Sequence, residues 1–103
     1  MNKNKISVLG GGSWGTVLAY LASLNDNEVT LWMRDEEVVK EINNNNINSK
    51  YLPNLNLGSN LTATSKIEDI SDSGIIIFCI PSDAFRKVSD LASSHVRDES
   101  FLV

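Results

Sequence analysis

The sequence predicts an α/β fold in which helices cover both faces of a doubly wound parallel sheet. Three observations lead to this prediction. Short apolar runs alternate with stretches whose apolar residues recur every three to four positions, the order expected of strands joined by helical crossovers. A run of glycines separates the first apolar run from the first helical stretch. A later run, residues 75–80, is apolar at every position, as expected where both faces of a strand are buried.

The composition bounds the kind of protein that this chain can form. Its 103 residues suit one domain, and a hydrophobic content of 42% with a charged content of 21% is ordinary for a globular protein. A net charge of −4 without a basic stripe argues against electrostatic binding to nucleic acid. No apolar segment approaches the roughly 18 residues of a membrane span, and no secretory leader is visible. We therefore expect a cytoplasmic protein without nucleic-acid partners or membrane insertion.

The first half of the chain holds two expected strands and two expected helices. Residues 5–9 form the first strand, residues 10–15 a turn, and residues 16–24 a helix. A polar break leads into a strand over 28–33, after which we expect Asp35 to cap a helix over 36–43. Residues 43–46 are four consecutive asparagines, a low-complexity tract for which we expect a surface loop. The apolar residues that give the first helix its spacing are Val17, Leu18, Leu21, Ala22 and Leu24.

The second half begins with an irregular segment over residues 44–60. One tyrosine and three leucines within residues 51–58 imply that this segment folds back onto the rest of the molecule. The remaining elements that we expect are a strand over 61–64, a short turn or helix near 66–70, a central strand over 74–80, a helix over 82–95 capped by Ser82, and a strand that begins at residue 100. Because the chain stops within that last strand, we expect it to be a fragment of a longer polypeptide that continues beyond Val103.

The glycines at the first strand-to-helix turn indicate a dinucleotide site. Gly10, Gly12 and Gly15 form a G-x-G-x-x-G pattern, with Gly11 inside it. The first glycine permits a tight turn, the second lets a pyrophosphate approach bare backbone, and the third allows close packing of helix and strand. The anion then meets free N–H groups at the positive end of the helix dipole. Residues 1–103 are therefore expected to form part of a Rossmann-type NAD(P)-binding domain.

The end of the second strand bears on the choice of cofactor. An acidic residue about 20 positions after the glycines accepts hydrogen bonds from the ribose 2′-OH of NAD, whereas an arginine accommodates the 2′-phosphate of NADP. Arg34 and Asp35 follow Gly15 by 19 and 20 positions, so spacing alone does not decide. We favour NADPH, because the guanidinium of Arg34 suits a phosphate and Asp35 suits the cap of the next helix. NADH remains the alternative.

Four segments along the chain read GGGSWGT (residues 10–16), LWMRD (31–35), YLP (51–53) and IPS (80–82). Together they resemble the NAD(P)-dependent glycerol-3-phosphate dehydrogenase family, and the resemblance extends over essentially the whole chain. The glycine pattern is shared by many dehydrogenases, whereas SWGT combined with YLP is more specific. The resemblance implies reversible reduction of dihydroxyacetone phosphate to sn-glycerol 3-phosphate, a precursor of phospholipids, by an enzyme that forms a homodimer at full length.

The resemblance also implies roles for single residues. Ser13 and Trp14 match the cofactor-contacting residues of the turn, Arg34 the contact to the adenosine end, and Tyr51 a further cofactor contact. Each has a structural alternative. Ser13 suits a helix N-cap, the ring of Trp14 suits core packing, Arg34 suits a solvated strand end, and Tyr51 suits a residue that holds its loop in place.

Ile80 and Pro81 lie at the expected carboxyl end of the fourth strand, the side on which open α/β sheets bind ligands. We expect both to form the wall of the nicotinamide pocket. Cys79 is the chain's one cysteine, lies in an apolar run and is expected to be a buried small hydrophobe. His95, the one histidine, is expected to end a helix and not to act in catalysis.

We expect no metal site and no catalytic residue within the chain, because the family's substrate-binding and proton-transferring lysines lie beyond Val103. The 103 residues by themselves are thus expected to be inactive. Two alternatives share the glycine turn. One is another NAD(P)-dependent dehydrogenase, related to 6-phosphogluconate dehydrogenase or ketopantoate reductase. The other is a nucleotide-sensing module without catalysis, against which Arg34 argues, because such modules commonly carry an acidic residue there.

Overall fold

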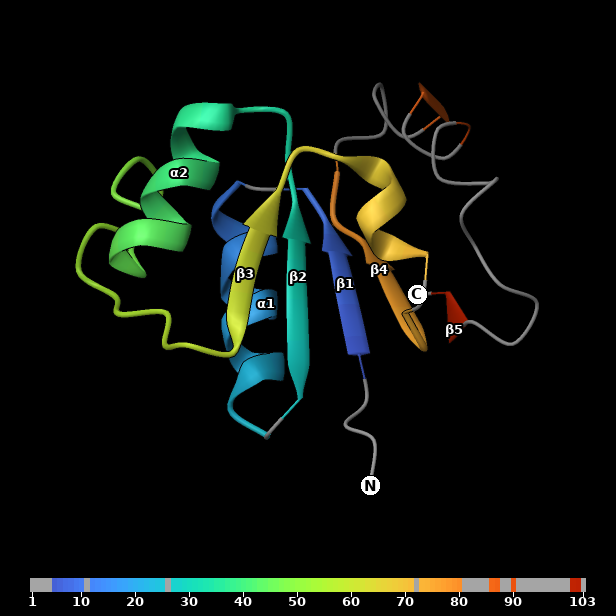
Figure 1. Ribbon diagram of the computed structural model, residues 1–103, viewed down its shortest axis with the longest axis horizontal. Helices are drawn as coiled ribbons and strands as arrows, with labels where there is room; N and C mark the ends of the chain where they lie inside the picture. Colours follow the sequence, from blue (N-terminus) through green and yellow to red (C-terminus); the bar gives the residue numbers. More distant parts are fainter. Residues whose placement is uncertain are drawn as a thin grey trace.

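A parallel β-sheet with helices on its two faces forms the body of the protein (Figure 1). A computed structural model describes residues 5–10, 12–25, 27–71, 73–80, 86–87, 90 and 101–102. Within them the sheet has five strands in the order β3-β2-β1-β4-β5, and every neighbouring pair is parallel. The predicted fold class is confirmed. The elements are β1 (Lys5–Leu9), α1 (Ser13–Ser23), β2 (Glu28–Trp32), α2 (Glu36–Asn45), β3 (Leu61–Thr64), the 3-10 helix η1 (Ile67–Ile70), β4 (Ile75–Phe78) and β5 (Phe101–Leu102).

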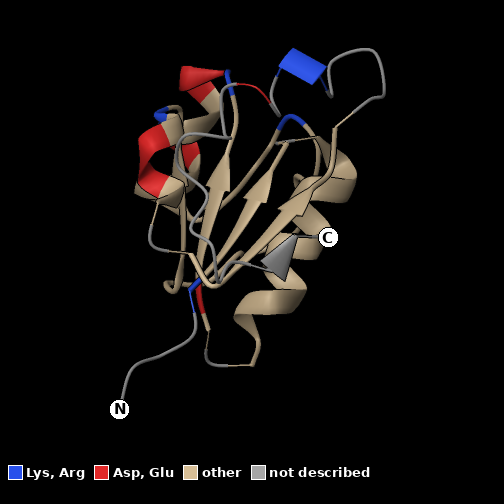
Figure 2. Cartoon of the chain, turned by 90° about the vertical axis from the view of Figure 1, so that its right-hand side faces the viewer, with Lys and Arg blue, Asp and Glu red and all other residues tan. Residues whose placement is uncertain are grey.

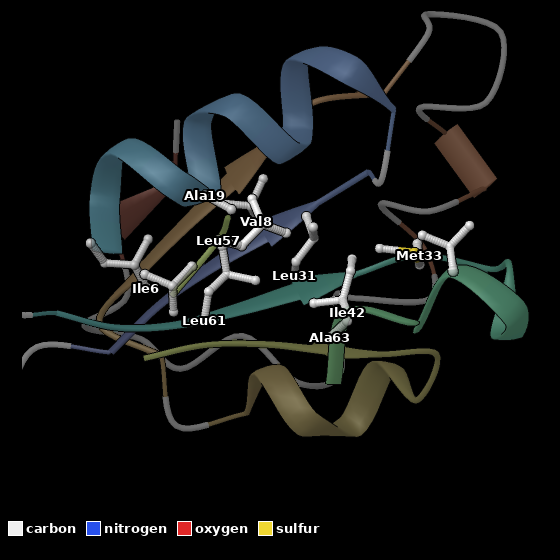
Figure 3. Close-up of a cluster of buried hydrophobic side chains, with 11 residues drawn as sticks. Ile6, Val8, Ala19, Leu31, Met33, Ile42, Leu57, Leu61 and Ala63 are labelled. Carbon is white, nitrogen blue, oxygen red and sulfur yellow. The ribbon is translucent and has the colours of Figure 1, made fainter. Parts of the chain in front are cut away.

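Alternate residues of the central strands belong to two hydrophobic clusters, one on each face of the sheet. In β1, Ile6 and Val8 join the cluster under α1 and α2, whereas Leu9 joins the cluster on the opposite face. Figure 3 shows the first cluster between α1 and the sheet, with Ala19 of the helix against the strand residues. Figure 1 shows α1 behind the sheet and η1 in front of it. The interior position predicted for the fourth strand is confirmed, because β4 lies between β1 and β5.

Two helices are longer than predicted. Helix α1 begins at Ser13 and not at residue 16. Gly12 still has an extended backbone, and the three residues after it already form the first turn of the helix. Helix α2 continues to Asn45 and so includes most of the asparagine tract that was expected to form a loop. Asn46 ends α2 in the left-handed conformation, at φ 60°, which asparagine tolerates better than most residues.

The asparagine tract also covers the edge of the sheet. The Asn43 side chain donates to the carbonyl oxygen of Ala63 at 2.9 Å and accepts from the Ala63 N–H at 2.8 Å. Strand β3 is the last strand on its side, and its outward backbone groups would otherwise be open to another chain. The prediction of a surface loop for the asparagine tract is therefore wrong, because the Asn43 side chain is bonded to the backbone of Ala63, 20 residues away.

The segment after α2 folds back as predicted. Leu57 is fully buried in the cluster under α1, and Leu55 packs against that cluster. The predictions for Gly11, Pro81, Ser82 and His95 lie outside the described residues, as does most of the helix expected over residues 82–95. Among the residues that are described, no helix is both long enough and apolar enough to cross a membrane.

Candidate functional site

Three of the predicted site residues lie at the carboxyl edge of the sheet, the upper edge in Figure 1. Gly10 directly follows β1, Arg34 comes two residues after β2, and Ile80 comes two residues after β4. A Cβ built on Gly10 would lie 3.0 Å from Cγ2 of Ile80, so these two residues are in direct contact. The structure thus brings Ile80, one of the two residues predicted to form the pocket wall, against the first glycine.

The three glycines of the motif are needed for three different reasons. Gly10 has φ +124°, and a side chain there would overlap the carbonyl oxygen of Cys79. A side chain on Gly15 would overlap the carbonyl oxygen of Gly10, so the helix lies directly on the turn. A Cβ on Gly12, in contrast, meets nothing within 4 Å. The backbone at Gly12 therefore faces open space, where an added methyl group would occupy the place of an incoming group.

The first turn of α1 leaves its N–H groups without a side-chain cap. Gly12 is the N-cap residue and provides no side chain, so the structural alternative for Ser13, that it caps this helix, is wrong. The helix carries no charged residue, and Figure 2 draws it without blue or red. No side chain of α1 or of its N-cap residue therefore offsets the positive end of the helix dipole, which favours an anion at this position.

Trp14 lies in the same turn with its side chain in solvent. It is 73% exposed, so the alternative that its ring packs in the core is wrong. Ser13 is exposed as well. Both side chains are therefore accessible from solvent at the start of α1.

The start of α2 differs, because its N–H groups have an internal partner. Oδ1 of Asp35 accepts from the backbone N–H groups of Glu37 at 3.1 Å and Val38 at 3.4 Å, which confirms the predicted cap. Oδ2 lies 3.3 Å from Nζ of Lys50. The hydrogen bond from Lys50, followed by the backbone hydrogen bonds, lowers the pKa of Asp35 below its ordinary value. Asp35 thus has both oxygens engaged within the protein.

Arg34 is exposed at the rim, and no hydrogen bond or ion pair joins it to another of the described residues. Lys50, the ion-pair partner of Asp35, also lies above the ring of Tyr51, with Nζ 5.5 Å from the ring centre. A shallow pocket of about 300 Å³ opens here. Its lining residues are Asp35, Glu37, Val38, Glu41, Ser49 and Lys50.

Tyr51 is joined to the glycine turn through a buried asparagine. Nδ2 of Asn48 donates to Oγ1 of Thr16 at 3.0 Å, and this hydroxyl donates to the carbonyl oxygen of Gly12 at 2.9 Å. Oδ1 of Asn48 accepts from the N–H of Tyr51 at 3.3 Å. Residues far apart in sequence therefore form one connected site.

The sequence did not indicate Asn48 or Lys50 as site residues. Asn48 follows the asparagine tract closely, and nothing local distinguishes it from its neighbours. Its partner Thr16 lies 32 positions away, so only the fold reveals the pair. Cys79 is half-buried and not fully buried as predicted, because it lies past the end of β4, where it packs against the cluster under α1 and α2. Burial raises the pKa of its thiol, which disfavours the thiolate form that a nucleophile needs. The described residues contain no group of three or more His, Cys, Asp or Glu side chains that could hold a metal ion.

Comparison with known proteins identifies the family of this chain. Residues 5–103 match the model of the NAD-dependent glycerol-3-phosphate dehydrogenase N-terminus. The chain is 45% identical, over its whole length, to glycerol-3-phosphate dehydrogenase [NAD(P)+] of Rickettsia massiliae, of which it covers 32%. It is 44% identical over 95% of its length to the enzyme of the same name from Rickettsia bellii, of which it covers 31%.

Solved structures of the family are also similar. The crystal structure of glycerol-3-phosphate dehydrogenase from Coxiella burnetii superimposes with a TM-score of 0.89 at 29% identity, over 97% of this chain and 31% of that chain. The enzyme from Plasmodium falciparum gives a TM-score of 0.88 at 29% identity, over 98% of this chain and 31% of that one. The chain spans about a third of the length of the relatives that it matches. It belongs to the family of NAD-dependent glycerol-3-phosphate dehydrogenases and corresponds to their N-terminal part.

Proposed function

We propose that this chain is the cofactor-binding part of a glycerol-3-phosphate dehydrogenase that transfers hydride reversibly between NAD(P)H and dihydroxyacetone phosphate. The observation that carries the proposal is the open space at Gly12, beside an uncapped helix that carries no charge. A pyrophosphate needs both features, because it must approach backbone N–H groups closely and is stabilised by the helix dipole. Membership of the family supports the same assignment.

NADPH is the cofactor that the strand-end residues favour. Asp35 has its oxygens occupied by two backbone N–H groups and by Lys50, so it has little capacity left for the ribose hydroxyls of NADH. Arg34 lies beside it, exposed and ready for a charge-assisted hydrogen bond to a 2′-phosphate. Tyr51, which the Asn48 contact holds near the glycine turn, is a further proposed contact to the cofactor.

The bound nicotinamide supplies the hydride, and the protein supplies binding, orientation and exclusion of water. In this division Gly10 makes the tight turn, its N–H donating to the carbonyl oxygen of Trp32. The backbone of Gly11, Gly12, Ser13 and Trp14 at the start of α1 then holds the pyrophosphate. Ile80, in contact with Gly10, and Pro81 form the wall at the nicotinamide end. We assign substrate binding and proton transfer to a further helical domain of the full-length protein, which we propose to be a cytoplasmic homodimer.

The test is a comparison of steady-state kinetics of the full-length protein with NADPH and NADH, using dihydroxyacetone phosphate as substrate. Arg34→Ala is expected to raise the KM for NADPH roughly tenfold, as the loss of one charge-assisted hydrogen bond would. The KM for NADH is expected to stay near its starting value. Lys40→Ala, which removes an exposed cation of α2, is the matched control and should change neither constant.

Two results would contradict the proposal. If the protein reduced another carbonyl substrate and left dihydroxyacetone phosphate unchanged, it would be a different dehydrogenase. If Arg34→Ala raised the KM for both cofactors equally, Arg34 would contact a part that NADPH and NADH share, and the preference for NADPH would lose its basis.

A further inference from the structure

We infer that Asn48 is a positioning residue for cofactor binding, which acts through Thr16 on the peptide group that meets the pyrophosphate. The inference rests on the proposed function and assigns a role to two residues that do not themselves touch the cofactor. It arises from an arrangement that a packing role would not require, a continuous series of hydrogen bonds that ends at the glycine turn.

The series begins inside the protein. Asn48 and Thr16 are both fully buried, so solvent does not compete for their hydrogen bonds. The Asn48 amide donates to the Thr16 hydroxyl, and the hydroxyl donates to the carbonyl oxygen of Gly12. The same carbonyl accepts the backbone N–H of Thr16 at 3.0 Å. Two donors from one residue thus fix the direction of the Gly12 carbonyl.

Fixing this carbonyl also fixes the N–H group on the other side of the peptide. The Gly12 C=O and the Ser13 N–H belong to one planar trans peptide, so they point in opposite directions. The carbonyl points into α1 toward Thr16, and the N–H therefore points out of the start of the helix. That is the direction from which an anion approaches a helix N-terminus.

The direction of the hydrogen bonds adds to the effect. Each group in the series donates toward the next, so every bond polarises the one that follows. When the Gly12 carbonyl accepts from Thr16, it withdraws electrons from the Ser13 nitrogen of the same peptide. The Ser13 N–H therefore becomes a stronger hydrogen-bond donor. Within a buried region, where the effective dielectric constant is low, this polarisation is larger than in water.

Asn48 also holds the segment that carries Tyr51. Its Oδ1 accepts from the Tyr51 N–H, and its backbone carbonyl accepts from the Leu52 N–H at 2.7 Å. A single side chain therefore connects two proposed contact regions, the glycine turn and the Tyr51 loop. A change at Asn48 is expected to weaken both.

The experiment compares five variants of the full-length protein by the Kd for NADPH, steady-state kinetics and the thermal unfolding midpoint. Thr16→Val keeps the shape of the side chain and removes the hydroxyl, whereas Thr16→Ser retains it. Asn48→Ala removes the amide, and the double variant Thr16→Val with Asn48→Ala tests whether the two residues act together. Asn43→Ala is the matched control, because it removes an asparagine with two hydrogen bonds that hold the sheet edge and not the site.

We expect Thr16→Val and Asn48→Ala each to raise the Kd for NADPH roughly tenfold. The KM for NADPH should rise with it while kcat stays near the wild-type value. Thr16→Ser should bind like the wild type. The double variant should be little weaker than either single variant, because both break the same series. Asn43→Ala should lower the unfolding midpoint and leave the Kd unchanged.

Three results would overturn the inference. Wild-type Kd values in Thr16→Val and Asn48→Ala would show that the series does not act on the site. Additive effects in the double variant would show that the two residues act separately. A wild-type protein that bound neither NADPH nor NADH would overturn the proposed function as well. If Thr16→Val did not fold, Asn48→Asp, which keeps the side-chain size and replaces the donor, would provide the comparison.

Discussion

At the scale of single residues, two glycines of the turn between β1 and α1 differ in the space around them. Gly15 lies directly against the Gly10 carbonyl, which belongs to the backbone and cannot move aside as a flexible side chain would. Gly12 has an ordinary φ of −73° and open space where a side chain would stand. The fold therefore requires a glycine at residue 15 but not at residue 12, where we propose that the pyrophosphate approaches the backbone.

The first prediction follows from this difference. Gly15→Ala is expected to destabilise the protein by about 3 kcal/mol or more, because the added methyl group overlaps backbone. Gly12→Ala is expected to change the free energy of unfolding by less than about 1 kcal/mol and to weaken cofactor binding at least roughly tenfold. Chemical denaturation and calorimetric titration measure the two effects. Equal loss of stability in both variants would contradict the role given to Gly12.

The second prediction concerns the pH dependence that Asp35 produces. Its pKa is lowered in the folded protein, by the hydrogen bond from Lys50 and then by the backbone N–H groups. A lowered pKa means that the stabilisation is complete above the unfolded value of 3.8 and is lost as the pH falls through the folded value. Asp35→Asn keeps a cap acceptor without the charge. The variant should therefore have a lower free energy of unfolding than the wild type at neutral pH, and the difference should decrease as the pH falls through that range. A deficit that stayed constant from about pH 3 to 7 would contradict the ion pair.

At the scale of elements, the end of α2 depends on one residue in an unusual conformation. Asn46 has φ 60°, and its N–H donates to the carbonyl oxygen of Ile42 at 2.9 Å. The left-handed conformation costs most residues about 1–2 kcal/mol, whereas glycine adopts it freely.

The third prediction tests this helix end. Asn46→Ala is expected to lower the free energy of unfolding by about 1 kcal/mol, and Asn46→Gly to leave it equal or slightly higher. Thermal unfolding of both variants measures the difference. Since Asn44 is an exposed residue within the same helix, Asn44→Ala serves as the control and should not destabilise. Equal stability of the Ala and Gly variants at residue 46 would rule out the left-handed cap.

Elements with a regular apolar pattern were predictable, and contacts between distant polar groups were not. The strand over 61–64 is confirmed to the residue, and the cap at Asp35 is confirmed because capping depends on neighbours in sequence. The asparagine tract was misjudged because the partner of Asn43 is a strand backbone 20 positions away. The role of Asn48 was not predicted for the same reason, because its partner Thr16 is 32 positions away. Hydrogen bonds between neighbours in sequence can be predicted from the sequence, whereas hydrogen bonds between residues far apart in sequence can be identified only once the fold is known.

At the scale of the whole molecule, the order of the strands places the site. The chain runs from β1 outward to β2 and β3, then returns to the other side of β1 to form β4 and β5. The direction of winding therefore reverses at β1, and ligands of open α/β sheets bind at such a reversal, beyond the carboxyl ends of the strands. Gly10 lies there, its N–H donating to the carbonyl oxygen of Trp32 at 2.8 Å, with the Cys79 carbonyl on its other side.

The glycine motif, the uncapped helix and the reversal of winding thus coincide at one edge of the sheet. The starts of the two helices differ. α1 has no side-chain cap and no acidic residue in its first turn, whereas α2 begins with Glu36 and Glu37 and is capped by Asp35. We propose that only α1 receives an anion. A second anion site of the same kind at α2 is therefore not expected.

The most direct test of the central claim is a calorimetric titration of the full-length protein with NADPH, repeated with Gly12→Ala. We predict saturable binding of one NADPH per chain and a Kd at least roughly tenfold higher in the variant, with an unchanged unfolding midpoint. NADPH binding that Gly12→Ala left unaffected would contradict the claim that the pyrophosphate lies against the backbone at Gly12.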